Sequence, residues 1–382
     1  MSDDFLVFGA PYIGDNEINE VVDSLKSGWL GTGPKVKKFE EHFRLYKSSK
    51  CAIAVNSCTA ALHLSLLSLG LKKGDEVITT PMTFCSTINA IIHAGARPVL
   101  ADIDSSSLNI DPNQIVKKIT NQTKCILPVH FAGRACDMDA IMNIAKTRNL
   151  RVIEDCAHAI ETTYRGKKAG TFGDYGCFSF YATKNLVTGE GGMVITDDES
   201  SANRIKRLAL HGMSQDAWKR FSDEGYQHYL VEEAGFKYNM MDLQAALGIH
   251  QLDRIEESWQ MRQDIWSKYN EEFRELPITL PSPPEEDTKH AYHLYTIIID
   301  EKRARISRDE FLNRMNQEKI GTGVHYLSIP EHPYYNKTFG WEPTEYPNAT
   351  SFGRGTVSLP LSPKLTSGDV ERVINVVHKI LR

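Results

Sequence analysis

The chain has 382 residues, of which 41% are hydrophobic and 24% are charged, a balance typical of a soluble globular protein and not of a disordered one. The net charge is −5 and no block of lysine and arginine occurs, so nucleic acid is not expected as a partner. The length predicts two or three domains, or one large α/β domain with an appendage.

The N-terminal residues, the length of the apolar runs and the spacing of the cysteines predict the cellular compartment of the protein. The first five residues are acidic and lack the basic and apolar regions of a secretion signal, and no apolar run approaches the ~20 residues of a membrane helix. Seven cysteines are scattered without a C-x-x-C pair, so we expect neither a zinc nor an iron–sulfur site. These features predict a cytoplasmic protein that has no membrane anchor and no metal.

Through the first two thirds of the chain, short apolar segments alternate with helical ones. Helices are predicted at 18–27, 35–45, 60–69 and 86–94, and strands at 51–55, 76–80, 98–102, 125–129, 151–155 and 192–196. Strands that are apolar along their whole length indicate a mainly parallel sheet with helices on both faces. In such a sheet, ligands bind beyond the carboxyl ends of the strands.

The pattern changes after about residue 247. A long charged amphipathic helix is predicted at 251–273, followed by a proline-rich connection at 280–287. A strand at 293–300 and helices at 308–318 and 370–381 complete the chain. We therefore expect a large α/β domain over 1–253 and a smaller α+β domain over 254–382.

The most informative stretch lies between residues 152 and 192. Asp155 ends a predicted strand, Lys184 lies in the run S-F-x-A-T-K-N, and G-E-G-G follows at 189–192. These motifs resemble the sugar aminotransferases of the DegT/DnrJ/EryC1/StrS family, and segments 28–34, 56–62, 74–78, 235–248 and 292–294 extend the likeness over nearly the whole chain. The resemblance implies a pyridoxal-phosphate-dependent transferase fold of the aspartate-aminotransferase type (fold type I), and a homodimer with sites at the subunit interface.

The resemblance also implies roles for three residues. Lys184 would hold pyridoxal 5'-phosphate and act as the general acid–base catalyst, which requires a neutral amine. Asp155 would pair with the pyridine nitrogen and keep the ring an electron sink, and His158 would lie near the phenolic oxygen of the ring. The structural alternatives are a surface lysine, a helix N-cap and a core histidine.

The phosphate and the ring would have further neighbours. Ser57, Cys58 and Thr59 lie between a strand and a helix, where backbone N–H groups bind phosphate, and Ser179 would add a hydroxyl. The resemblance places Phe84 on one face of the ring. Helix capping and a place in the core remain the alternatives for these residues.

Two more groups of residues are expected at the site. By resemblance, Lys237 or Asn239 reaches the phosphate of the neighbouring subunit, and the sequence leaves open which of them does so. A structural role is an equal alternative for the candidate substrate residues Trp29, Thr32, His325 and Tyr326. Substrate specificity is expected to depend on loops such as 210–234.

The resulting hypothesis is transamination in two half-reactions. L-glutamate would convert the cofactor to pyridoxamine 5'-phosphate, which would aminate a nucleotide-linked keto-sugar, most similar to a UDP-4-keto sugar, for a surface polysaccharide, lipopolysaccharide or glycan. A sugar dehydratase of the same scaffold commonly replaces the lysine by histidine, and a regulatory member would lose Lys184 or Asp155; both are present. A nicotinamide oxidoreductase is disfavoured because no G-x-G-x-x-G follows an early strand.

Overall fold

The computed structural model describes residues 4–214 and 230–382. Residues 215–229, which form most of the predicted specificity loop at 210–234, lie outside the described residues. No helix within the described ranges is both long enough and apolar enough to cross a membrane.

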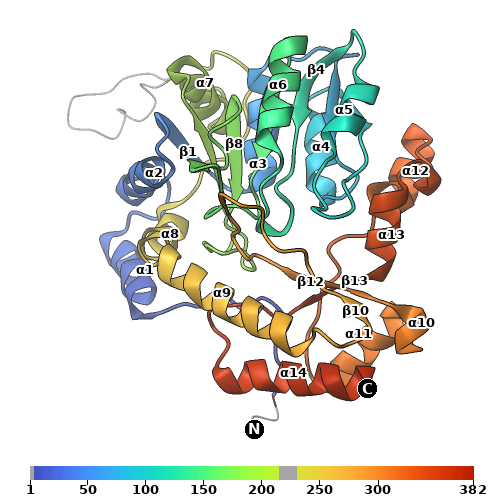
Figure 1. Ribbon diagram of the computed structural model, residues 1–382. Coiled ribbons are helices and arrows are strands. Elements are labelled where there is room, and N and C mark those ends of the chain that lie inside the picture. The colour runs from blue at the N-terminus through green and yellow to red at the C-terminus, as the bar shows by residue number, and fades with distance from the viewer. Residues whose placement is uncertain (1–3, 215–229) are drawn as a thin grey trace.

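A seven-stranded sheet forms the centre of the first part of the chain (Figure 1). Its spatial order is β1 (Cys51–Val55), β9 (Gly192–Thr196), β8 (Tyr175–Ser179), β5 (Arg151–Asp155), β4 (Thr123–Leu127), β2 (Glu76–Thr79) and β3 (Arg97–Leu100). Only β9 runs antiparallel to its neighbours, and the pairs from β8 to β3 are parallel. The predicted mainly parallel sheet is confirmed, whereas β8 was not predicted as a strand.

Helices cover both faces of this sheet because its strands are apolar on both sides. Along β1, Ile53 and Val55 pack with helices on one face, and Ala52 and Ala54 pack with those on the other. The helices of this part are α1 (Asp15–Ser27), α2 (Pro34–Lys47), α3 (Cys58–Ser68), α4 (Cys85–His93), α5 (Pro112–Lys118), α6 (Met138–Arg148), α7 (Glu199–Ala209) and α8 (Asp242–Asp253). Helices α3 and α7 belong to the first face, and α2 and α8 to the second.

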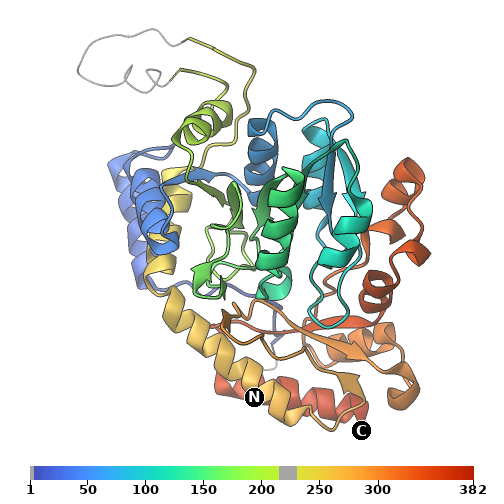
Figure 2. The same cartoon turned by 45° about the horizontal axis from the view of Figure 1, so that its top comes forward.

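The last third of the chain builds a second core beneath the large sheet (Figures 1 and 2). Its three-stranded antiparallel sheet has the order β10 (Ile278–Thr279), β12 (Tyr295–Ile299) and β13 (Thr356–Leu359). The helices of this part are α9 (Ile255–Glu272), α10 (Glu301–Ala304), α11 (Arg308–Gln317), α12 (Pro333–Phe339), α13 (Pro347–Gly355) and α14 (Ser367–Leu381). Buried residues of α12 and α13, Tyr335 and Phe352, pack in a cluster with Ile88 of α4 instead of in the second core. A small third sheet joins β11 (Thr288–Lys289), β6 (Thr163–Tyr164) and β7 (Lys167–Lys168).

Two details modify the expected organisation. The single helix predicted at 251–273 is divided at Arg254, where α8 ends and α9 begins. The N-terminal segment also packs against the last third of the chain, since Leu6 pairs with Ile320 and Phe8 stacks on His325. The division into domains at 253/254 stays a prediction.

Candidate active site

The carboxyl edge of the large sheet gathers residues from distant parts of the sequence. Val55 at the end of β1 and Ser179 at the end of β8 both pair with Gly192, the first residue of β9. Asp155 ends β5, which is the next strand beyond β8. Lys184 follows β8 in a turn closed by a hydrogen bond from its backbone N–H to the carbonyl of Tyr181.

Gly192 lets the start of helix α3 approach the sheet closely. A Cβ at this position would lie 2.5 Å from the carbonyl carbon of Ser57 and 2.7 Å from the backbone nitrogen of Cys58. Both distances are shorter than real Cβ atoms show, so only glycine fits. The last glycine of G-E-G-G therefore positions the predicted phosphate-binding turn.

The turn itself has the features that a phosphate requires. Ser57 caps α3, because its hydroxyl accepts a hydrogen bond from Ala60 at 3.1 Å. Cys58 is buried and Thr59 is exposed, so the thiol does not occupy the space outside the first turn. Capping and phosphate binding are compatible here, since the remaining N–H groups of the first turn are free to face an anion.

Asp155 is held in place from two sides. Its carboxylate accepts hydrogen bonds from the hydroxyl of Thr87 at 2.9 Å and from the backbone N–H of Ala157 at 3.1 Å. Burial raises its pKa, although these two hydrogen bonds and the charge of Lys184 act in the opposite direction. A buried carboxylate of this kind favours a cationic partner such as a protonated ring nitrogen.

Thr87 is a site residue that sequence reasoning missed. It lies in the first turn of α4, and its hydroxyl also contacts that of Thr83 at 2.7 Å. The spacing of four residues places both hydroxyls on one side of the helix start, which was the available signal. Contact with Asp155, 68 residues away, could be seen only in the folded chain.

The Lys184 side chain is partly buried at the same edge. Removal from water lowers its pKa to about 8, and the nearby Cys58 and Asp155 oppose that shift. At pH 7 roughly one amine in ten is then neutral, against a far smaller share for an ordinary lysine. The residue is therefore suited to attack a carbonyl carbon and to carry a proton.

His158 connects this edge with the last third of the chain. Its Nδ1 accepts a hydrogen bond from the backbone N–H of Ala132 at 3.2 Å, so the proton of the neutral ring is on Nε2. That Nε2 lies 3.0 Å from the hydroxyl of Tyr326. Burial, together with the charge of Lys184, holds the pKa of His158 well below its usual range.

The two predicted substrate residues of this region have different surroundings. Tyr326 also faces Phe84, with ring centroids 6.0 Å apart, and Phe84 is 56% exposed. An aromatic ring this exposed is not a core residue, so it is free to stack on a ligand. His325 contacts Ser358 at 2.8 Å and Phe8, and burial lowers its pKa to about 4.

Trp29, Thr32 and Asn239 form a separate cluster. The Trp29 indole donates a hydrogen bond to the carbonyl of Thr32 at 3.2 Å, and the amide of Asn239 donates to the Thr32 hydroxyl at 2.6 Å. Asn239 also pairs by its backbone with Val55. Lys237 is exposed, and its ammonium forms no hydrogen bond or ion pair with residues 4–214 and 230–382.

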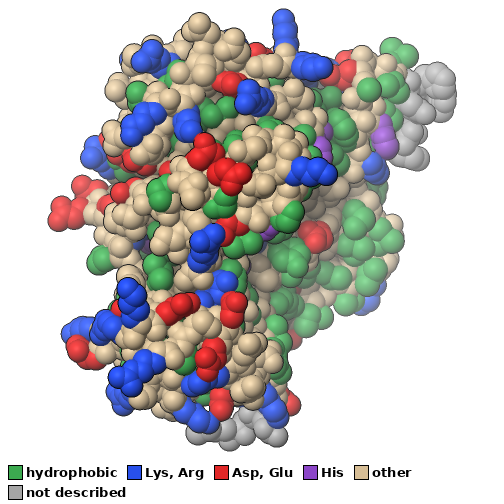
Figure 3. Space-filling view, turned by 90° about the vertical axis from the view of Figure 1, so that its right-hand side faces the viewer, with side chains coloured by type: hydrophobic (Ala, Val, Ile, Leu, Met, Phe, Trp, Pro, Cys, Tyr) green, Lys and Arg blue, Asp and Glu red, His purple; other side chains and the backbone are tan. Residues whose placement is uncertain are grey.

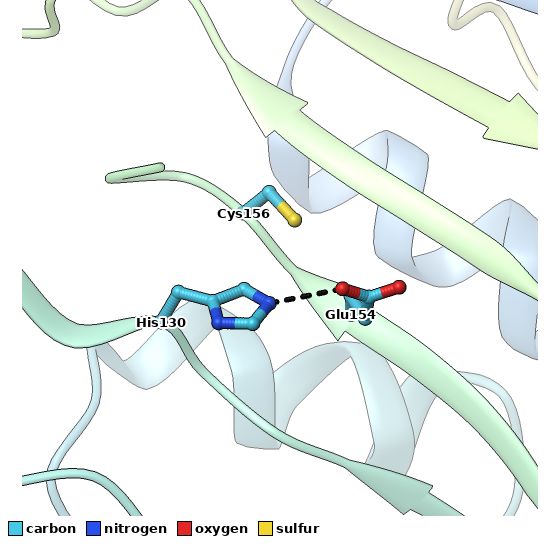
Figure 4. Close-up of side chains that lie close together, drawn as sticks. All are labelled: His130, Glu154 and Cys156. Carbon is cyan, nitrogen blue, oxygen red and sulfur yellow. Dashed lines mark hydrogen bonds and ion pairs between the residues drawn. The ribbon is translucent and has the colours of Figure 1, made fainter. Parts of the chain in front are cut away.

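A buried group of His130, Glu154 and Cys156 has the residue types of a metal site (Figure 4). The Glu154 carboxylate already accepts hydrogen bonds from the backbone N–H groups of Gly170, Phe172 and Gly173, at 2.7, 2.7 and 2.8 Å. His130 approaches the same carboxylate at 3.1 Å. The Glu154 carboxylate is thus engaged in holding loop 170–173, and His130 Nδ1 accepts a hydrogen bond from the backbone N–H of Cys136.

A lysine of lowered pKa, a buried carboxylate, an exposed aromatic ring and a helix N-terminus at one sheet edge define a site of the kind that pyridoxal-phosphate enzymes use. The residues present fit the cofactor: Lys184 would hold it, Asp155 would face its ring nitrogen, and the start of α3 would hold its phosphate. The cofactor itself supplies a ring that accepts electrons from the substrate carbon.

Comparison with known proteins identifies the family of the chain. The chain belongs to the DegT/DnrJ/EryC1/StrS aminotransferase family, which it matches over residues 11–378. The spore coat polysaccharide biosynthesis protein SpsC of Bacillus subtilis (strain 168) is 49% identical over 379 residues, 99% of this chain and 97% of that protein. The enzyme is accordingly a pyridoxal-phosphate-dependent aminotransferase, and the fold-type-I expectation is confirmed.

Solved structures give the same result. The PLP form of the putative sugar aminotransferase Spr1654 from Streptococcus pneumoniae has a TM-score of 0.90 and 33% identity, covering 99% of this chain and 100% of that one, and a PMP form of the same protein is also known. PseC from Helicobacter pylori, an aminotransferase of pseudoaminic acid biosynthesis, has a TM-score of 0.90 and 28% identity, covering 99% of each chain.

The Glu154 contacts generate a prediction about stability. Glu154→Gln places an amide NH₂ group where backbone N–H groups now find a carboxylate, so at least one buried donor loses its acceptor. We expect the free energy of unfolding to fall by about 2–4 kcal/mol. Urea denaturation followed by circular dichroism measures this loss. Exposed Glu41→Gln is the control, and an equal, small effect of both variants would contradict the anchoring role of Glu154.

Proposed function

We propose that this aminotransferase moves the amino group of L-glutamate onto a keto-sugar carried by a nucleotide, most similar to a UDP-4-keto sugar, in the cytoplasm. The observation that carries the proposal is the Lys184 amine, with its pKa lowered to about 8, at the sheet edge that also holds Asp155. The names of the relatives support the sugar as substrate class, since SpsC is named for a spore coat polysaccharide and PseC for pseudoaminic acid biosynthesis. Such products are consistent with a role in surface polysaccharides or glycans.

In this proposal each residue has a distinct task. Lys184 would carry the proton between the amino-bearing carbon of the substrate and the bound cofactor, because its amine is partly neutral at pH 7. Asp155, fixed by Thr87 and Ala157, holds a proton on the ring nitrogen and so keeps the ring electron-withdrawing. His158 and Tyr326, which contact each other, would lie beside the ring, and Phe84 would cover one of its faces.

We also propose that the enzyme is a homodimer whose two sites are shared. Large hydrophobic side chains near the site are exposed in the single chain, namely Trp29, Leu30, Phe84, Tyr181 and Met241. Figure 3 shows hydrophobic side chains gathered in a broad area near the right-hand edge of that view. Covering such an area by a second copy removes it from water.

Lys237 is the better candidate for a contact with the partner's phosphate. The Asn239 amide is already engaged by Thr32, whereas the Lys237 ammonium is exposed and has no partner among residues 4–214 and 230–382. A lysine supplies positive charge to a phosphate without the fixed geometry of arginine.

The experiment that tests the proposed function is an absorbance spectrum. We expect the protein loaded with pyridoxal 5'-phosphate to absorb near ~420 nm and to shift toward ~330 nm on addition of L-glutamate. Lys184→Ala should abolish this shift and the covalent fixation of cofactor by borohydride, with an unchanged melting temperature. Lys379→Ala, an exposed lysine of α14, is the control. A wild-type spectrum that does not change on addition of L-glutamate would contradict the assignment of L-glutamate as the amino donor.

The pKa of Lys184 predicts a pH dependence. Because burial lowers that pKa to about 8, the neutral amine increases tenfold per pH unit below 8 and levels off above it. The second-order rate constant for capture of pyridoxal 5'-phosphate by the apo-protein should follow the same curve. Stopped-flow absorbance from pH 6 to 10 measures it, and a rise that continues to pH 10 would contradict the lowered pKa.

Hybrid dimers test the sharing of the site. We expect Lys237→Ala to weaken cofactor binding by about 10–100-fold, through loss of a charge-assisted phosphate contact. Lys184→Ala and Lys237→Ala chains are then co-expressed with different tags, and the hybrid is isolated. If the two residues come from different subunits, the hybrid retains one intact site and about half of the wild-type activity. Activity no higher than the mean of the two variant homodimers places both residues in one subunit, and a monomer in light scattering overturns the dimer.

A further inference from the structure

A line of buried polar side chains leads from Glu161 to the candidate active site. It contains Glu161, Asn185, His293 and His158, which are between 2% and 8% exposed. Asn185 follows Lys184 directly in the sequence, and His158 lies beside Tyr326. Neither Glu161 nor His293 was recognised as a site residue from the sequence, and the mechanism above does not use them.

The orientation of the Asn185 amide is fixed by its acceptors. The Nδ2 atom lies 3.0 Å from each carboxylate oxygen of Glu161 and 2.8 Å from the carbonyl oxygen of Ala291. The Ala291 carbonyl can only accept a hydrogen bond, and the Glu161 carboxyl group presents an acceptor oxygen in either protonation state, so the NH₂ group faces them. The amide oxygen is thereby directed to the opposite side.

That oxygen in turn determines where His293 carries its proton. His293 Nδ1 lies 2.9 Å from Asn185 Oδ1, and a carbonyl oxygen can only accept. Burial, together with the charge of Lys184, holds the pKa of His293 well below its usual range, so the ring is neutral. A neutral ring has one proton, which must therefore be on Nδ1, and Nε2 keeps its lone pair.

His293 transmits this arrangement by packing. Its ring centroid lies 4.3 Å from that of His158, at an interplanar angle of 35°. His158 is fixed separately by Ala132 and Tyr326. Both imidazoles lie close enough to Lys184 for the charge of its ammonium to lower their pKa values.

We propose that Glu161 is a positioning residue of the active site: through the Asn185 amide it selects the Nδ1–H tautomer of His293 and holds the Lys184 turn against the neighbouring pair of His293 and His158. Without an acceptor at position 161, the amide loses two of its three acceptor contacts, and only the Ala291 carbonyl still opposes a rotation by half a turn. Its NH₂ group would then face His293 and require the proton on Nε2. The effect on chemistry rests on the proposed function of Lys184, whereas the effect on the tautomer does not.

The charges around Glu161 leave this role intact. Burial raises its pKa to about 7, and Arg262, Asn185 and Lys289 act in the opposite direction. A protonated carboxyl group still has one carbonyl oxygen that accepts from Asn185. The positioning therefore needs an acceptor oxygen at this place and not a full negative charge.

The test compares two variants of Glu161. Glu161→Gln keeps one acceptor oxygen at nearly the same position, and Glu161→Met fills the same space with no acceptor. Glu76 provides a matched control, because it is a buried carboxylate that accepts from Thr120 at 2.6 Å at the opposite, amino end of the sheet. Glu76→Met and Glu76→Gln report the cost of removing any buried carboxylate.

The first readout is the tautomer in the full-length apo-protein. With ¹⁵N-labelled histidine, two-bond proton–nitrogen correlation spectra separate the Nδ1–H and Nε2–H forms, and His293→Gln assigns the signal. We expect the Nδ1–H pattern for His293 in the wild type, in Glu161→Gln and in both Glu76 variants. Glu161→Met should convert it wholly or partly to the Nε2–H pattern. An unchanged pattern in Glu161→Met overturns the proposal.

The second readout is the half-reaction with L-glutamate in the loaded enzyme. We expect Glu161→Met to slow its limiting rate about tenfold with little change in the glutamate concentration at half-maximal rate, and Glu161→Gln to slow it less than about threefold. Slowing by Glu161→Met no greater than that by Glu76→Met overturns the positioning role. A wild type that shows no half-reaction refutes the proposed function instead, and with it the effect on chemistry.

Should Glu161→Met fail to fold, Glu161→Asp takes its place. Its carboxylate is one methylene shorter and cannot reach Asn185 Nδ2 with both oxygens at hydrogen-bonding distance. The same two readouts apply, and a wild-type tautomer pattern together with a wild-type half-reaction in that variant overturns the proposal.

Discussion

The close approach of helix α3 to the first residue of β9 is the constraint on which the site depends. Gly192 pairs with Val55 on one side and with Ser179 on the other, so it holds the carboxyl ends of β1 and β8 together. Any side chain at this position would meet the backbone of Ser57 and Cys58. The single antiparallel strand of the sheet thus creates the place where the N–H groups of a helix and the loop of Lys184 meet.

At this edge of the sheet, burial shifts the pKa values of the titratable side chains more than contact with opposite charges does. Lys184 loses affinity for its proton, while Asp155 is stabilised by Thr87 and a backbone N–H. His158, His293 and His325 all have lowered pKa values, so the amine is surrounded by neutral rings. Desolvation disfavours each cation, and hydrogen bonds then decide where the remaining protons lie.

Some predicted site residues owe their place to nearby secondary structure, and others to contacts between distant parts of the chain. Asp155, Ser57 and Ser179 occupy strand ends or helix starts, so their common location followed from the parallel sheet. Thr32 and Asn239 meet across 207 residues, and Tyr326 meets His158 across 168. No pattern along the chain encodes such contacts, since they arise from how the second core packs on the first.

The sequence alone determined the mainly parallel character of the sheet, most helices and the family, and it predicted candidate residues for the cofactor site, because apolar periodicity and short motifs are local properties. The antiparallel β9 beside an unpredicted β8, the return of residues 6–8 to the last third of the chain and the support of Asp155 by Thr87 were decided by tertiary structure. The same holds for the Glu161–Asn185–His293 line. The polar residues of this line follow no local periodicity in the sequence. Their hydrogen-bond partners are determined in the folded chain, because a buried donor without an acceptor costs free energy.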